Sequence, residues 1–220
     1  EHGKYKATLR VRTCMDVPEA FDFGQMVRSA DLKSLVIDSY VSLREGAKHV
    51  EVVSEVENNA LDHRLRVLFP SGATAAETYL ADTPFDVVER KIALREDNEI
   101  YREPEMSEKP QQSFSAVSDA KRGLAVISSA LLEAGVLDQV ERPLALTLFR
   151  ATRQTVGTNG EPDGQLQGKL TFHYWLKPFA GLADRMEMLH LGQRLSGGVR
   201  AAQLFPKDVN MHKAAPALPA

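Results

Sequence analysis

Apolar and polar residues alternate along most of the first two-thirds of the chain, with the period of two that is typical of β-strands. Residues 6–13 show the pattern clearly. One face would carry the apolar side chains Ala7, Leu9 and Val11, and the other would carry Lys6, Thr8, Arg10 and Arg12. The alternation predicts a strand with one buried face.

The same pattern recurs between breaks that are rich in glycine and proline. Residues 35–58 are predicted to form two strands joined by a turn at Glu45-Gly46. Further strands are predicted in residues 61–69, 76–82, 85–94, 112–119, 123–140, 142–152 and 171–179. The apolar run Leu144–Phe149 is typical of a strand buried on both faces.

The C-terminal part departs from this alternation. Leu182, Met186 and Leu189 recur at helical spacing up to Gly197-Gly198, which predicts one short helix. Residues 95–112 and 155–169 are polar and predict exposed loops, and residues 205–220 predict an irregular tail. Because helices do not alternate with strands, the predicted fold is mostly β. We expect one large antiparallel β-sandwich domain over residues 1–220.

Composition and charge exclude several classes of partner. The formal net charge is −3 and like charges do not form runs, so we expect no nucleic acid partner. No apolar run approaches the roughly 20 residues that span a bilayer, so we expect no membrane partner. Cys14 is the only cysteine, which rules out an intrachain disulfide and favours a cytoplasmic location.

Familiar catalytic motifs are absent from the sequence. It contains no phosphate-binding glycine loop, no G-x-S-x-G nucleophile turn and no H-E-x-x-H zinc motif. The six histidines are scattered, and no two stand at a spacing that aims both rings at one metal. The motifs therefore identify no catalytic residue and no metal ligand, and they leave open a zinc site assembled from distant strands.

The triplet Asp62-His63-Arg64 is the first candidate for chemistry. In a strand over residues 61–69, Asp62 and His63 would point to opposite faces and could not act as an acid–base pair. His63 would lie on the apolar face, as a core or interface histidine with a hydrogen-bonded ring. Asp62 and Arg64 would share the polar face and form cross-strand ion pairs.

Residues 85–91 and the aromatic pair Tyr174-Trp175 are weaker candidates. Asp86 and Glu89 would lie on opposite faces, so they are not the carboxyl pair that flanks a glycosidic bond. Asp86 and Arg90 would share a face, where we expect an ion pair for Arg90. Tyr174 and Trp175 could stack on a sugar or belong to the core.

Several segments, taken in order, resemble the C-terminal β-domain of the glycoside hydrolase family 38 α-mannosidases, especially the bacterial ones. The segments are ENNALDHRLRVLFPSG, ADTPFDVVERK, SFSAVSDAKRGLAVISSALLEAGVLD, RPLALTLFRA and DGQLQGKLTFHYWLKP. The positions that match the family pattern are Asn58, Asp62, His63, Arg64, Leu65, Arg66, Asp82, Phe85, Asp86, Val87, Arg90, Asp163, Gly164, Gln165 and Gly168. The resemblance covers roughly residues 5–195.

The resemblance implies a large sandwich of the galactose-mutarotase-like (supersandwich) type within a three-part enzyme. Such enzymes hydrolyse α-mannosides with retention, through an aspartate nucleophile, a second acidic residue and a zinc ion held by His and Asp. The family's H-x-D and D-x-F-G-H motifs are missing here. No catalytic or metal residue is carried over, and the zinc is expected in a catalytic domain outside this chain. The chain would be a fragment of the β-region, truncated at both ends.

Three hypotheses follow from the resemblance. In the first, the chain is a non-catalytic domain that packs on the catalytic domain of its own parent chain, with Asp163 and Gln165 at the rim of the α-mannoside cleft. Asn58, Asp62, His63, Arg64, Asp86 and Arg90 would then be structural motif residues. In the alternative, it is a carbohydrate-binding module for mannose-containing glycans, acting through Tyr174, Trp175 or residues 155–169. In the third, the incomplete sandwich exposes a strand edge and forms a homo-oligomer.

Overall fold

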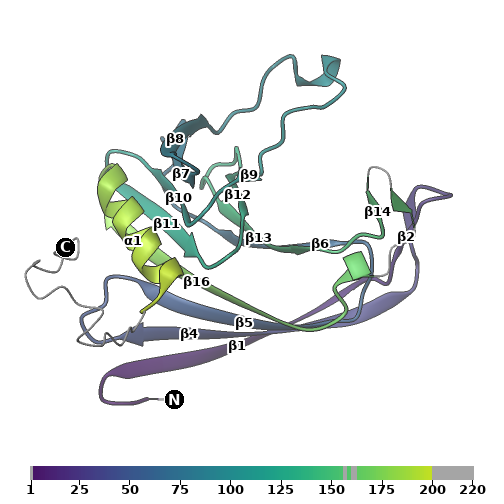
Figure 1. The fold of residues 1–220 in the computed structure, drawn as a ribbon, viewed down its shortest axis with the longest axis horizontal. Coiled ribbons are helices and arrows are strands. Elements are labelled where there is room, and N and C mark those ends of the chain that lie inside the picture. The colour runs from purple at the N-terminus through teal and green to yellow at the C-terminus, as the bar shows by residue number, and fades with distance from the viewer. Residues whose placement is uncertain (1, 156–157, 160–162, 200–220) are drawn as a thin grey trace, which may run out of the picture.

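Two antiparallel β-sheets of unequal size build the fold (Figure 1). The computed structural model describes residues 2–155, 158–159 and 163–199. The larger sheet has eight strands in the order β1-β4-β5-β16-β11-β10-β7-β8, and the smaller has four in the order β6-β13-β12-β9. The predicted mostly β, antiparallel sandwich is confirmed.

The strand bounds follow the predicted segments closely. The larger sheet contains β1 (Lys6–Pro18), β4 (Leu32–Arg44), β5 (Val50–Asn58), β7 (Thr78–Thr83), β8 (Asp86–Lys91), β10 (Phe114–Ser118), β11 (Arg122–Ser128) and β16 (Gly168–Ala180). The smaller contains β6 (Arg64–Phe69), β9 (Lys109–Pro110), β12 (Glu133–Val136) and β13 (Leu144–Arg150). The predicted turn between β4 and β5 is confirmed, with Gly46 at a φ of +73° that a glycine adopts without strain.

Among the described residues, five further features, all short, lie outside the two sheets. Two small hairpins pair β2 (Phe21–Asp22) with β3 (Val27–Arg28), and β14 (Gln154–Thr155) with β15 (Thr158–Asn159). The 3-10 turns are η1 (Asn98–Ile100) and η2 (Asp163–Gln165), and the helix is α1 (Arg185–Gly197). No helix in the described part of the chain has the length and apolar content that crossing a bilayer requires.

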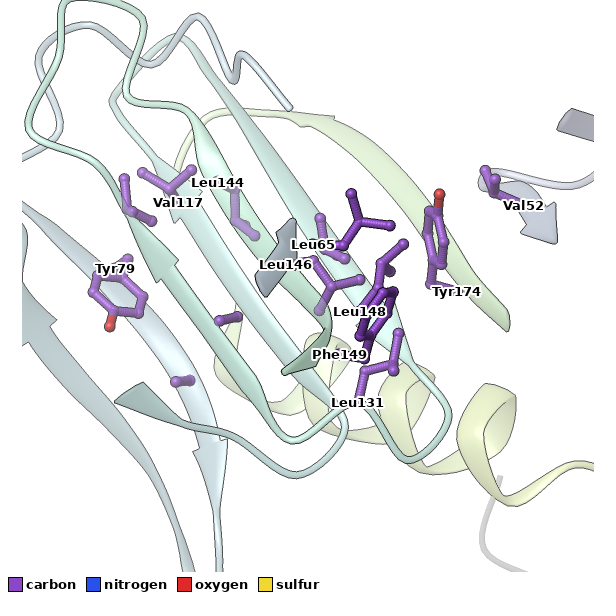
Figure 2. Close-up of a cluster of buried hydrophobic side chains, with 14 of the residues drawn as sticks. Val52, Leu65, Tyr79, Val117, Leu131, Leu144, Leu146, Leu148, Phe149 and Tyr174 are labelled. Carbon is purple, nitrogen blue, oxygen red and sulfur yellow. The ribbon is translucent and has the colours of Figure 1, made fainter. Parts of the chain in front are cut away.

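The main core lies between the two sheets. Figure 2 shows Leu65, Leu146 and Phe149 gathered near Tyr174 of the larger sheet. All residues of Leu144–Phe149 are buried, so the strand predicted to be covered on both faces is confirmed. A register shift between Thr147 and Phe149 in the β13–β6 pair lets both Leu148 and Phe149 contribute to this core.

Helix α1 covers a second core on the outer face of the larger sheet (Figure 1). Met188 and Leu191 are buried against Phe114, Ile127 and Trp175. The predicted helix and its end at Gly197 are confirmed. The predicted apolar face was wrong for Leu182 and Met186, which are 73% and 56% exposed, whereas Leu189 packs against the second core beside Met188 and Leu191.

Strand β1 differs from its predicted half-buried state. It pairs with β4 over thirteen residues without a register shift, yet Leu9 is 65% and Val11 43% exposed. The smaller sheet has half as many strands as the larger one, and β1 lies at the outermost edge of the larger sheet. The prediction of one buried face was therefore wrong for β1.

Two predicted segments change character along their length. Residues 123–140 do not form one strand, because the chain leaves the larger sheet after Ser128 and enters the smaller one at Glu133. Residues 95–112 are mostly irregular and exposed, but Glu108 and Gln111 are buried. The prediction of an exposed loop was therefore wrong at the C-terminal end of this segment. Residues 205–220 lie outside the described residues.

Candidate functional site

The first and last segments that carry the family resemblance meet in a buried polar junction formed by Asn58, Asp62 and Gln165. Asp62 lies just before β6, with a φ of +54°, so the prediction that it belongs to the strand was wrong. Its carboxylate Oδ1 accepts a hydrogen bond from Gln165 Nε2 at 2.6 Å. The Asp62 N–H donates to Gln165 Oε1 at 2.9 Å. The oxygen and the nitrogen of the Gln165 side-chain amide therefore both bind Asp62.

Asn58 completes the polar junction from the end of β5. Its Nδ2 donates to the carbonyl oxygens of Gln165 at 3.0 Å and Leu166 at 2.9 Å. Gln167 Nε2 donates to the Ala60 carbonyl at 2.8 Å. Asn58 Oδ1 is buried without a partner among the described residues. The hydrogen bonds of the junction fix one arrangement of the chain, because each broken bond would leave a further buried group unpaired. The junction therefore ties residues 58–62 to residues 165–167.

The β2–β3 hairpin is held to the same carboxylate. Asp62 Oδ2 accepts the Phe21 N–H at 3.3 Å and lies 3.2 Å from Arg153 Nη2. Arg28 Nη1 donates to the Asp62 carbonyl at 2.7 Å. The predicted ion pair of Asp62 exists, but its partner Arg153 lies on the loop after β13 rather than on a neighbouring strand. Sequence reasoning missed this hairpin, whose strands are only two residues long.

His63 packs on the core as predicted, with its ring edge-to-face on Phe149 at a centroid distance of 5.2 Å. Neither ring nitrogen meets a hydrogen-bond partner of ordinary geometry among the described residues. Burial lowers the pKa of His63 below its ordinary value of 6.5, although the nearby Leu61 backbone favours the charged ring. Asp62 is engaged with Gln165, Phe21 and Arg153, and the two side chains form no acid–base pair.

A shallow hollow of about 390 Å³ opens beside this triplet. It is lined by Phe21, Phe23, Arg28, Asp62, His63, Arg64, Arg150, Ala151 and Thr152. Arg28 and Arg153 lie over the rings of Phe21 and Phe23, at 5.7 Å and 5.4 Å from the ring centres. The arginines of this hollow are paired inside the fold, since Arg150 binds Glu133 at 2.9 Å and Arg64 lies 3.5 Å from Glu108. The pairing favours a packing surface over a reaction centre.

Asp86 and Arg90 lie on β8, at the opposite edge of the larger sheet from β1. Asp86 is exposed, and its carbonyl accepts a hydrogen bond from the Thr83 hydroxyl at 2.9 Å. The ion pair expected for Arg90 is absent among the described residues, and its Nη1 is buried without a hydrogen-bond partner. Glu89, which projects to the other face, pairs with Arg185 of α1 at 3.3 Å.

The predicted rim residues differ in exposure. Asp163 is exposed at the start of η2, whereas Gln165 is buried and its amide is bound to Asp62. Contact of Asp163 or Gln165 with substrate stays a prediction, and Asp163 is the residue of the two that faces solvent.

Both aromatic residues considered for sugar stacking are buried. Tyr174 is 2% exposed and its hydroxyl lies 2.9 Å from Ser54 Oγ, within the main core. Trp175 is 6% exposed beneath α1. A hollow of about 560 Å³ next to Trp175 is lined by polar residues that include His49, Glu51, His173 and Arg194. His173 Nε2 lies 3.0 Å from Glu51 Oε1, and its ring packs on the indole at 4.1 Å.

The zinc ion that the resemblance implies has no fitting set of ligands here. Among residues 2–155, 158–159 and 163–199, no three His, Cys, Asp or Glu side chains are grouped so that they could hold a metal ion. We derive no chemical step through a metal in this chain.

Comparison with known proteins agrees with the fold and with the family resemblance. The family model described as the glycosyl hydrolases family 38 C-terminal domain matches residues 2–165. A putative mannosylglycerate hydrolase from Halalkalibacterium halodurans is 27% identical over 160 residues, which are 70% of this chain and 16% of that protein.

Two solved structures from Enterococcus faecalis share the fold. An alpha-mannosidase from strain V583 has a TM-score of 0.76 and 26% identity, over 87% of this chain and 23% of that one. A protein in the glycosyl hydrolase family 38 has a TM-score of 0.73, with the same identity and coverage. The chain thus spans less than a quarter of the length of these relatives. Since the matched segment is well over half of the chain, the chain belongs to the glycosyl hydrolase family 38 C-terminal domain family.

Proposed function

We propose that this chain is the non-catalytic β-domain of a longer hydrolase that cleaves α-mannosidic bonds with retention, at a zinc-dependent site outside these 220 residues. The family match over residues 2–165 carries the proposal. The chain supports its catalytic domain and brings the exposed Asp163 toward the rim of the cleft.

The use of the motif residues supports a structural role. A retaining glycosidase needs two carboxyl groups about 5–5.5 Å apart, both open to the sugar. Asp62, a buried carboxylate of the motif, is instead committed to Gln165, to the Phe21 N–H and to Arg153. The same bonds join segments that are far apart in the sequence, with separations of 41 for Asp62 and Phe21 and 103 for Asp62 and Gln165.

Hydrolysis of an aryl α-mannoside tests the proposal. The purified 220-residue chain should show no turnover, while the parent enzyme should hydrolyse the substrate and lose activity on treatment with a chelator. Turnover by the isolated chain that a chelator abolishes would contradict the assignment.

The leaving group of the parent's substrate needs a separate comparison. The names of the relatives share the mannosyl group but differ in what it is attached to. Parallel assays of the parent with an aryl α-mannoside and with mannosylglycerate distinguish a general α-mannosidase from an enzyme that requires the glycerate carboxylate.

We also propose a cytoplasmic location for the parent enzyme. Its support is Cys14, the only cysteine of the chain, which is exposed as a free thiol.

A further inference from the structure

Among the described residues, the edge of β1 that faces away from β4 carries no strand beyond the bridge at Ala7, and this free edge is long, regular and apolar on one face. The strand keeps one register with β4 over thirteen residues, from Lys6 opposite Arg44 to Pro18 opposite Leu32. On the face that continues the inner layer of the larger sheet, Leu9 is 65%, Val11 43% and Met15 38% exposed. Open edges of this kind attract another strand.

The usual protection of an edge strand is weak here. Natural edges are guarded by bulges, prolines or charged side chains. The β1–β4 register has no shift, and Pro18 stands only at the last position. Arg10 and Arg12 project to the opposite face, where both bind Asp38, at 2.8 Å and 2.7 Å. The edge of β1 can therefore accept another strand.

The beginning of the described chain already lies on that edge. Ala7 pairs with Leu43 of β4 on one side and forms an antiparallel bridge with His2 on the other. The Gly3 N–H donates to the Lys6 carbonyl at 2.9 Å, which closes the turn between them. Figure 1 shows this hook at the N-terminal end, turning back along β1. The polypeptide leaving His2 toward the N-terminus thus points along the free edge.

We propose that the stretch of parent polypeptide directly before Glu1 forms an antiparallel strand on the free edge of β1. The inference rests on the proposed function, in which the chain is one part of a longer hydrolase. The relatives have room for such a strand, since this chain spans 16% and 23% of their lengths.

The His2–Ala7 bridge fixes the register of the proposed strand. The residue directly before Glu1 would lie opposite Leu9, the third residue before it opposite Val11, and the seventh opposite Met15. Residues directly opposite each other share a face of the sheet. We expect apolar side chains at those upstream positions, and polar or acidic ones at the second and fourth, opposite Arg10 and Arg12.

The coding sequence upstream of Glu1 gives the first test, and a protein extended by about 10 native residues, the upper end of usual strand lengths, gives the second. Relative to the 220-residue chain, the extended protein should have a higher Tm. Hydrogen exchange at the β1 amides that face away from β4 should slow by about tenfold or more.

Matched variants separate pairing from a general gain in stability. Leu9→Lys should cancel the gain in the extended protein and leave the Tm of the 220-residue chain nearly unchanged, because Leu9 is already 65% exposed there. Val140→Lys is the control, since Val140 is 81% exposed on a loop and should be neutral in both proteins.

Three results would overturn the proposal. They are an upstream sequence without the apolar alternation, unchanged exchange in β1 of the extended protein, and a dimer paired through β1 that persists in that protein on light scattering. The last result would assign the edge to a second copy. Hydrolysis by the parent enzyme is measured separately, so a failure of the strand leaves the hydrolase proposal standing, whereas an inactive parent removes the proposed function.

Discussion

Asp62 shows how a residue that looks catalytic can serve the fold. Its side chain is 3% exposed and its φ is positive, a conformation that Asp and Asn tolerate better than most residues. The carboxylate joins the β2–β3 hairpin, the loop after β13 and η2. Replacing Asp62 should therefore lower the free energy of unfolding.

We predict a graded series of substitutions at Asp62. Asp62→Ala should lower the free energy of unfolding by about 2–4 kcal/mol, because buried partners lose their acceptor and alanine resists a positive φ. Asp62→Asn should cost roughly half as much, since it keeps one acceptor and the backbone conformation. Urea unfolding measures both. Asp163→Asn, at an exposed position, is the control, with an expected change within about 0.5 kcal/mol.

A double-mutant cycle locates the effect. If Asp62 and Gln165 act together, Gln165→Ala should cost much less in the Asp62→Ala background than alone, because the reciprocal bonds are already broken. Additive costs would show that the polar junction does not stabilise the fold as a unit.

His63 makes stability depend on pH. Burial lowers the pKa of His63 in the folded protein, so the unfolded chain binds the extra proton more readily. Stability from this residue is therefore complete above the unfolded pKa of about 6.5 and falls as pH drops below it. His63→Gln, which stays neutral, should flatten the loss between about pH 7 and pH 5, as measured by urea unfolding. An equal loss in both proteins would contradict this.

The residue scale also shows what the sequence can predict. Alternation placed His63 on the apolar face and Arg64 on the polar face with an ion pair, and the structure agrees, since His63 packs on Phe149 and Arg64 lies 3.5 Å from Glu108. The hydrogen bond between Asp62 and Gln165 could not be predicted, because alternation describes neighbouring residues and not a partner 103 residues away in the sequence. The positive φ of Asp62 was missed for a related reason, since tertiary bonds hold it there.

At the scale of elements, α1 depends on close approach to the larger sheet. Its second core forms around Met188, Leu191 and Trp175, and Gly192 faces Ser113 and Phe114. A Cβ at Gly192 would overlap the Ser113 hydroxyl, which is held in place by a hydrogen bond to the buried Asp82. The helix can therefore lie this close only with a glycine at that position.

We predict opposite results for two glycines of α1. Elsewhere in a helix Gly→Ala gains about 0.5–1 kcal/mol. Gly192→Ala should instead lower Tm, because either the helix or Ser113 must move. Gly197→Ala is the matched control at the end of the same helix, where nothing lies within 4 Å of the added Cβ, and it should be neutral or raise Tm. Trp175 fluorescence measures whether the helix moves away from the larger sheet. An unchanged Tm for Gly192→Ala would contradict the close packing of α1 on that sheet.

Elements could be predicted unevenly. The strands and the end of α1 follow from periodicity and from Gly197-Gly198. The exposure of β1 did not follow, because its alternation describes a face suited to burial and does not say whether a second layer covers it. The change of sheet between Ser128 and Glu133 was missed, because that stretch contains neither glycine nor proline to mark a break.

At the scale of the whole molecule, the burial of the aromatic residues bears on the glycan-binding alternative. Tyr174 and Trp175 are 2% and 6% exposed, so neither presents a ring face to a sugar. We predict no heat of binding and no change in Trp175 fluorescence when the chain is titrated with methyl α-mannoside or oligomannosides. A fluorescence change that Trp175→Phe removes would revive the binding-module hypothesis.

The place of β16 in the larger sheet has a consequence for how the chain folds. This strand lies between β5 and β11, and pairs Gly168 with Asn58 on one side and Arg122 with Ala180 on the other. A ribosome making the chain completes β1, β4 and β5, and then β7, β8, β10 and β11, before the strand that joins them exists. Until synthesis passes Ala180, both halves keep an unpaired edge facing the other, exposed to misassociation. Folding of this sheet is therefore a late event, and a nascent chain stalled before residue 168 should remain sensitive to protease.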